Sequence, residues 1–126
     1  MTVPEEPFPD IEAVLIEYLG SLAPTGETNP DEITGPFIRV NRVGGFDDGF
    51  TDRPRVEIAC HALTRREAQR LSEVARQWVL ACDSTDAAGV FIDHAMTESQ
   101  AGRTPYQNED VRRIAANYRL SLRRPR

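Results

Sequence analysis

The chain contains no lysine, and no basic residue of any kind precedes Arg39. The first 36 residues carry eight carboxylates and therefore a net charge of minus eight, whereas the other 90 residues hold twelve carboxylates against fifteen arginines, or plus three. The overall charge of -5 argues against general affinity for nucleic acid, because non-specific binding depends on clustered cations. Opposite charges on two parts of one surface instead favour head-to-tail association of copies, which closes into a ring when the rotation per subunit is right.

Long apolar runs and cysteine clusters are also missing. No run of 18 apolar residues occurs, and the N-terminus has acids and prolines where a signal peptide would be basic and then apolar, so we expect no membrane contact and a cytoplasmic protein. The two cysteines, Cys60 and Cys82, are too few and too far apart for a disulfide framework or a paired-cysteine metal clip. We expect them to be buried free thiols.

The length of 126 residues fits one domain with one core. Prolines and glutamates predict an extended arm over residues 1–9, followed by a single α+β domain over 10–126. Asp10 can cap a helix whose apolar residues recur at three-four spacing from Ile11 to Leu22. Turn residues then predict an acidic loop over 23–36.

Two strands are expected next. Residues 37–43 are rich in β-formers, and residues 55–62 alternate cleanly between apolar and polar side chains. Between them, residues 44–54 hold three glycines and three aspartates, which predicts a long mobile connection.

The second half repeats this order. Thr64 and Glu67 form a capping box in front of an apolar stripe that continues to Cys82, so a long helix is expected there. Strands are predicted over 90–98 and from Ile114 to Arg123, with a polar loop over 99–109 between them. The resulting order is helix, two strands, helix, two strands, which favours a mostly antiparallel four-stranded sheet with both helices on one face.

The search for catalytic or cofactor chemistry yields one group. Strand alternation for Cys60 and His94, and the helical stripe for Cys82, predict that all three face the core, where they could form the site of a small enzyme or ligand-binding domain. The close spacing that preorganises a zinc site is missing, so buried thiols and a hydrogen-bonded histidine are the stronger interpretation. We therefore predict no catalytic residues, no metal, no cofactor and no enzymatic activity.

The stretch from Gly44 to Gly49 offers two further interpretations. It lacks the lysine and following helix of a phosphate loop and the late glutamate of a calcium loop. A flexible surface loop is the simplest account. The alternative is a contact loop that orders against a partner, with Phe46 and Phe50 as anchors.

The final strand has one apolar and one basic face. Its basic side chains include Arg113, Arg119 and Arg123. A solvated face and a nucleic-acid surface are both conceivable, although the aromatic residues that single-strand binders place between such cations are absent. Charge complementarity favours an interface with acids of a neighbouring copy. Candidate acids in the acidic loop are Glu27, Asp31 and Glu32.

Several stretches resemble the tail terminator proteins of long-tailed, siphovirus-type bacteriophages, especially those of actinobacterial phages. They are the amphipathic helix after a proline-rich arm, Pro36 to Val40 leading into Val43-Gly44-Gly45, Pro54 to Cys60, the long helix ending near Trp78, and Tyr118 to Arg123. The resemblance covers most of the chain.

The resemblance implies a small α+β structural protein of the virion. Family members form a ring, hexameric in the family, on the last ring of the tail tube, where they stop tube growth and present the surface that joins tail to head. The implied partners are copies of the chain, the tail tube protein and a neck or head-completion protein. The implied location is the head-proximal end of the tail, reached from the host cytoplasm, and DNA can pass through the lumen without being read.

Within that picture, Phe46, Asp47, Asp48 and Phe50 are candidate contacts with the tube or the neck. A head-tail connector, meaning a neck or head-completion protein, remains an alternative because it shares size and ring habit.

Overall fold

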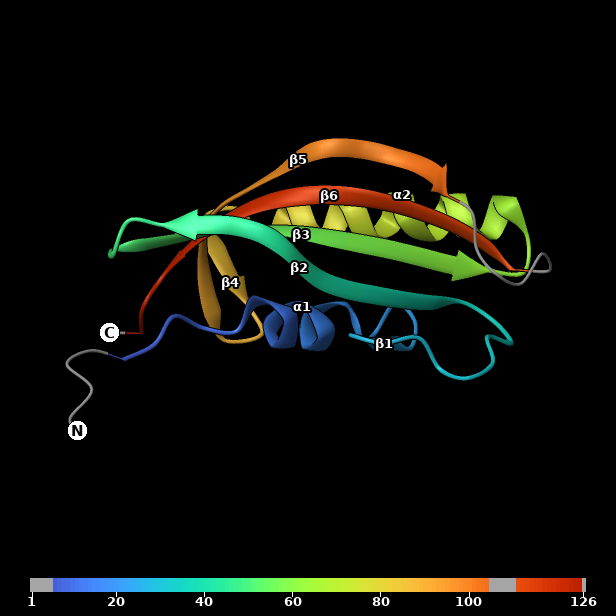
Figure 1. The fold of residues 1–126 in the computed structure, drawn as a ribbon, viewed down its shortest axis with the longest axis horizontal. Helices are drawn as coiled ribbons and strands as arrows, with labels where there is room; N and C mark the ends of the chain where they lie inside the picture. Colours follow the sequence, from blue (N-terminus) through green and yellow to red (C-terminus); the bar gives the residue numbers. More distant parts are fainter. Residues whose placement is uncertain (1–5, 105–110, 126) are drawn as a thin grey trace.

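The computed structural model describes residues 6–104 and 111–125, which form two helices and one curled six-stranded sheet (Figure 1). The elements in chain order are α1 (Ile11–Leu19), β1 (Thr25–Gly26), β2 (Phe37–Asp47), β3 (Thr51–Ala62), α2 (Arg65–Ala81), β4 (Thr85–Ala87), β5 (Val90–Thr104) and β6 (Arg112–Arg123). The α+β class predicted from the sequence is confirmed. In this described part of the chain, no helix is both long and apolar enough to cross a membrane.

The sheet has the strand order β1-β2-β3-β6-β5-β4. Its four central strands are the four that the sequence predicts, and they pair antiparallel throughout. The expectation of only four strands is wrong, because β1 adds a parallel pair at one edge and β4 an antiparallel pair at the other. These two strands are two and three residues long, too short for an alternating pattern to be visible.

Both helices begin at the predicted caps. The Asp10 carboxylate accepts hydrogen bonds from the amides of Glu12 and Ala13, and the Thr64 hydroxyl accepts one from the amide of Glu67 at 3.1 Å. These bonds satisfy amide groups that the first helical turn leaves without partners. The predicted starts of both helices are therefore confirmed.

The two helices cover the same face of the sheet. Four α1 side chains and two from α2 join one apolar cluster with inward residues of the four central strands. The Tyr18 hydroxyl of α1 also donates a 2.6 Å hydrogen bond to the Trp78 carbonyl of α2. Strand β6 shows the sequence logic most clearly, since every second residue from Ile114 to Leu122 is buried. We call the opposite side of the sheet its outer face.

The predicted mobile connection over residues 44–54 is wrong. Strands β2 and β3 continue through it as one antiparallel hairpin, and only a short turn over 48–50 separates them. Glycine and aspartate are common in loops, but here they build a bulge and a tight turn. At Gly45, φ is 112°, and a Cβ there would lie 2.7 Å from the Cα of Pro54, so a side chain has no room.

The predicted loop over 99–109 is wrong as far as Thr104, because β5 continues to that residue. Three register shifts against β6 interrupt the alternation along β5, which hides the strand from pattern analysis. Residues 105–110 of that loop and residues 1–5 of the predicted arm lie outside the described residues. Residues 6–9 of the arm have no regular secondary structure.

Candidate functional site

The group Cys60, Cys82 and His94 does not assemble. Both thiols lie in the core, where burial raises the pKa of Cys60 to about 12 and that of Cys82 to about 11, so neither is a thiolate at neutral pH. The prediction that His94 faces the core is wrong, since its side chain is 75% exposed and lies 3.7 Å from an Asp83 oxygen. A register shift between Ile92 and His94 inverts the alternation there. Within residues 6–104 and 111–125, no three His, Cys, Asp or Glu residues are grouped so as to hold a metal ion.

His61 is the second histidine, and it is fully buried on the outer side of β3. Its ring lies beside that of Phe37, with 6.3 Å between centroids. Burial, followed by the nearby Arg113 guanidinium, lowers the pKa of His61 to about 4, so the imidazole is neutral at pH 7. This environment suits a packing residue better than an acid or base that exchanges protons with solvent.

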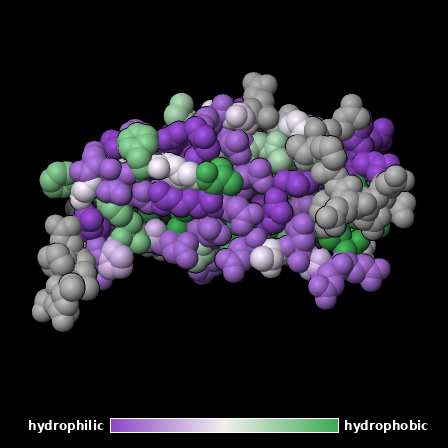
Figure 2. Space-filling view, in the orientation of Figure 1, coloured by the Kyte–Doolittle hydropathy of each residue, from purple (hydrophilic) through white to green (hydrophobic). Residues whose placement is uncertain are grey.

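The outer face of the sheet carries the basic residues predicted from β6. In Figure 1, α2 lies behind the strands, so the strands turn this face to the viewer, and the same view in Figure 2 shows a mainly hydrophilic surface. Arg113, Arg119 and Arg123 all lie on it, but each is paired with an acid of the same chain. Their partners are Glu57, Glu98 and Asp93 respectively.

Two of these acids are shared between arginines. Glu57 lies 3.0 Å from Arg39 and 3.2 Å from Arg113, and Glu98 bridges Arg55 and Arg119 in the same way. Each of these triads therefore keeps one net positive charge. The side chains of Arg113 and Arg119 are only 19% and 23% exposed, whereas that of Arg123 is 63% exposed.

The predicted acidic partners, Glu27, Asp31 and Glu32, are exposed on the loop between β1 and β2. The Asn41 side chain donates a 2.9 Å hydrogen bond to the Glu27 carbonyl, which ties this loop to β2. Because the three arginines already have partners on other strands, the structure does not bring these acids and arginines together within one chain. The predicted contact between these acids and arginines would therefore have to join two copies of the chain.

The exposed end of the β2–β3 hairpin, residues 42–52, is here called the hairpin tip. It presents three large apolar side chains to solvent. Val43 is 49% exposed, Phe46 57% and Phe50 81%. Isolated apolar side chains on a surface are ordinary, but three on one short segment make the hairpin tip a candidate contact site.

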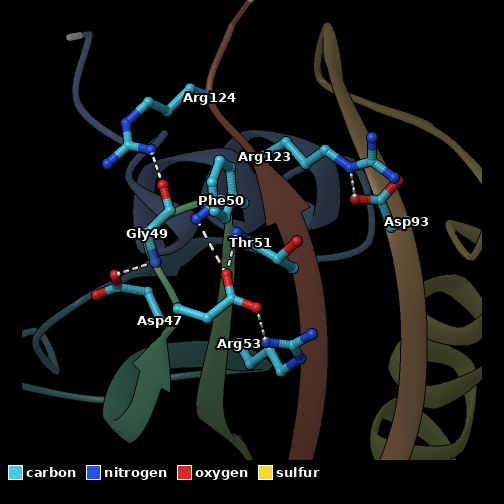
Figure 3. A network of polar contacts seen from close by, with 9 residues as sticks. Asp47, Gly49, Phe50, Thr51, Arg53, Asp93, Arg123 and Arg124 are labelled. Carbon is cyan, nitrogen blue, oxygen red and sulfur yellow. Dashed lines mark hydrogen bonds and ion pairs between the residues drawn. The ribbon is translucent and has the colours of Figure 1, made fainter.

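Polar contacts hold the turn of the hairpin tip (Figure 3). The Asp47 carboxylate accepts from the Gly49 amide at 3.0 Å, and one Asp48 oxygen accepts from the amides of Phe50 and Thr51 at 3.0 and 2.8 Å. The Arg53 guanidinium donates to the other Asp48 oxygen at 3.1 Å. The amides of Thr51 and Phe50, and then Arg53, lower the pKa of Asp48 to about 2. Phe50 therefore lies on a turn whose shape is held by contacts within the chain.

Further contacts brace the hairpin tip at its base and join it to neighbouring segments. Asp52, 2% exposed, receives two hydrogen bonds from Arg42 at 2.7 and 2.9 Å. The ring of Phe46 lies 5.7 Å from the Arg53 guanidinium and 5.6 Å from that of Arg119. Arg124 donates to the Gly49 carbonyl and also lies 4.1 Å from the Phe8 ring, which ties the hairpin tip to both terminal segments.

Local sequence patterns do not predict the roles of Arg42, Asp52 and Arg124. The first two are ten residues apart, and only the hairpin register brings them together. The bond from Arg124 to Gly49 spans 75 residues and leaves no signal in local patterns.

Comparison with known proteins adds independent findings. A family model described as "Phage tail termination protein" matches residues 7–126. The comparison with curated proteins gave no match. Among solved structures, a chain from "Virion of native gene transfer agent (GTA) particle" superposes with a TM-score of 0.60, covering 88% of this chain and 85% of that chain at 13% identity. At that identity the likeness shows a shared fold.

Proposed function

Because this chain belongs to the family of phage tail termination proteins, we propose that it forms a ring on the last ring of the tail tube and stops tube growth there. The family match confirms the resemblance found in the sequence and makes the chain a structural protein of the virion tail. We place the proposed ring at the head-proximal end of the tail.

The observation that carries the proposal is the exposure of Phe50 on a turn fixed by its own polar contacts. An aromatic side chain that is 81% exposed contributes little to the stability of its own fold, but it buries a large apolar area when a partner covers it. Because the turn is already ordered, binding does not have to order it. We therefore assign Phe46, Asp47, Asp48 and Phe50 to the axial contact with the tube.

Charge supports the contact between copies. The two arginine triads keep net positive charge on the outer face, while Glu27, Asp31 and Glu32 are exposed on the acidic loop. Arg123 has the most exposed of the three arginine side chains, and Arg113 and Arg119 act through the net charge of their triads. We propose that the acidic loop of one copy faces the basic outer face of the next, with DNA free to pass through the lumen.

This charge contact is best tested from its acidic side. Reversing the three arginines would also break their bonds to Glu57, Glu98 and Asp93, which would confuse assembly with stability. Neutralising the acids in Glu27→Gln, Asp31→Asn and Glu32→Gln leaves the outer-face ion pairs intact. We expect the triple variant to need higher protein concentration to form rings in sedimentation, with a smaller dependence on salt than the unmodified chain. Unchanged assembly would show that the acidic loop does not contribute to the interface between copies.

The axial contact is tested by growing tubes from purified tail tube protein. The unmodified chain should bind tube ends and prevent their extension when fresh tube protein is added. Phe50→Ala should raise the concentration needed for capping about 30-fold, which corresponds to about 2 kcal/mol for an aromatic anchor. Leu63→Ala is the matched control, because Leu63 is 46% exposed and follows β3 at the end opposite to Phe50.

Equal capping by both variants would contradict the assignment of the hairpin tip. The alternative function, a neck or head-completion protein, makes a different prediction in the same assay. Such a protein would bind DNA-filled, tailless capsids and leave tube ends free to grow.

A further inference from the structure

The sheet has two open edges. Strand β1 pairs with β2 only at Ile38 and Arg39, and β4 pairs with β5 only at residues 90–92. Among the described residues, β2 from Val40 to Asp47 and β5 from Asp93 to Thr104 thus have a neighbouring strand on one side only. Open edges expose backbone groups that can pair with another strand.

The two edges run in opposite directions. Three antiparallel pairs separate them, β2 with β3, β3 with β6, and β6 with β5, so the direction reverses three times. A rotation that keeps the strand axis direction therefore brings β2 of one copy antiparallel to β5 of the next. The antiparallel alternation of the central strands would then continue from one copy into the next.

The open stretches also lie at matching heights along the sheet. Pairing places Asn41, Glu57, Asn117 and Ser99 in one row, and Gly44, Arg55, Arg119 and Met96 in another. Strand β1 covers the edge of β2 only at Ile38 and Arg39, before the row of Asn41. Strand β4 covers the edge of β5 only at residues 90–92, at the opposite end of the sheet. Copies placed side by side at the same height thus face each other with their open segments.

The side chains on the edges fit a shared interface. Val43 on β2 and Met96 on β5 are each about half exposed, at 49% and 58%. Met96 lies in the row of Gly44, which has no side chain and leaves room on the facing edge. Register shifts in β2 and β5 bend these strands, and such bends provide the curvature that a closed sheet needs.

Charge agrees with the same arrangement. The bond from Asn41 ties the acidic loop beside the β2 edge. On the other side of the molecule, Arg113 pairs in register with Thr104, one strand inward from the β5 edge. Joining the edges would therefore set the acidic loop of one copy close to Arg113 of the next.

We propose that the β2 edge of one copy pairs antiparallel with the β5 edge of the next, so that the ring is built around one continuous β-sheet. This inference rests on the ring of the proposed function and specifies its subunit contact. The occupant of each edge is a second copy of this chain.

Engineered disulfides test the contact directly. The double variant Val43→Cys/Met96→Cys places one thiol on each edge and changes no residue assigned to the tube contact. Within one chain the two edges are three strand spacings apart, or about 14 Å, which exceeds the roughly 7 Å between Cα atoms that a disulfide tolerates. Mild oxidation of assembled rings should give a covalent ladder up to the full ring on a denaturing gel without reductant. The buried Cys60 and Cys82 should stay unreacted.

Leu63→Cys/Met96→Cys is the control pair, because Leu63 is exposed but lies on neither edge, and it should give no ladder. Hydrogen exchange of the unmodified chain provides a second readout. The outward-pointing amides in residues 40–47 and 94–99 should exchange about tenfold more slowly in the ring than in the monomer.

Each outcome decides a different claim. Rings that form and cap tubes, yet give neither the ladder nor the protection, would overturn the edge pairing and leave the proposed function standing. Disulfide dimers of the single-cysteine variants would show like edges meeting and would also overturn it. A chain that stays monomeric even with tube ends present would overturn both proposals.

Discussion

The two halves of the β2–β3 hairpin differ in what holds them. In the half covered by the helices, Ile38, Val40, Val56 and Ile58 are at most 1% exposed. In the hairpin tip, residues 42–50 are all exposed and the shape depends on hydrogen bonds and ion pairs. One continuous pair of strands is thus a core element at one end and a rigid projection at the other, which is the form expected of a contact that must exist before its partner binds.

Truncation of a core side chain should have the largest effect on the free energy of unfolding. Ile58→Ala removes a side chain that is 1% exposed and should lower the free energy of unfolding by about 2–5 kcal/mol. Phe50→Ala in the hairpin tip should change it by about 0.5 kcal/mol or less, because the ring is already in solvent. Urea denaturation followed by circular dichroism measures both. A similar loss of unfolding free energy in both variants would mean that the hairpin tip is part of the core.

Replacement of the buried Asp52 carboxylate at the base of the hairpin tip should lower the free energy of unfolding by an intermediate amount. Asp52→Asn takes the charge from the two hydrogen bonds of Arg42 and should cost about 1–3 kcal/mol. The matched control is Asp93→Asn, whose partner Arg123 is 63% exposed, with an expected cost of about 0–1 kcal/mol. If the two variants lose equal stability in the same urea assay, Asp52 does not anchor the tip.

Acid should loosen the turn while leaving the core intact. Hydrogen bonds from Thr51 and Phe50 lower the pKa of Asp48 to about 2 from its ordinary value of 3.8. The folded pKa is depressed, so this contribution to turn stability is present above about pH 4 and is lost as pH falls toward about 2. The amide NMR signals of Phe50 and Thr51 should titrate with a midpoint near 2, and Asp48→Asn should abolish that transition. A midpoint near 4 would contradict the hydrogen bonding of the turn.

The same division explains which features could be predicted from the sequence. The alternation in residues 55–62 and from Ile114 onward reports burial on one face, and the caps Asp10 and Thr64 act within three residues, so local patterns found them. The hairpin tip escaped because glycine and aspartate look the same in a tight turn and in a long loop.

Other features depend on pairing between distant strands. The bulge that turns His94 to the surface belongs to the register of β5 against β6 and has no local signature. The sharing of Glu57 between Arg39 and Arg113 joins three strands across 74 residues of sequence. The basic face of β6 could be predicted from the positions of its arginines. Their ion pairs with acids of the same chain could not, because those acids lie on other strands.

Electron cryomicroscopy of tail tubes capped by this protein tests the central claim most directly, namely that the chain works by assembly through its projecting hairpin. The account predicts a closed ring on the tube end, with the Phe50 side chain of every copy buried against the last ring of tube protein. A ring whose hairpin tips point away from the tube into solvent, or a single copy bound without a ring, would contradict it.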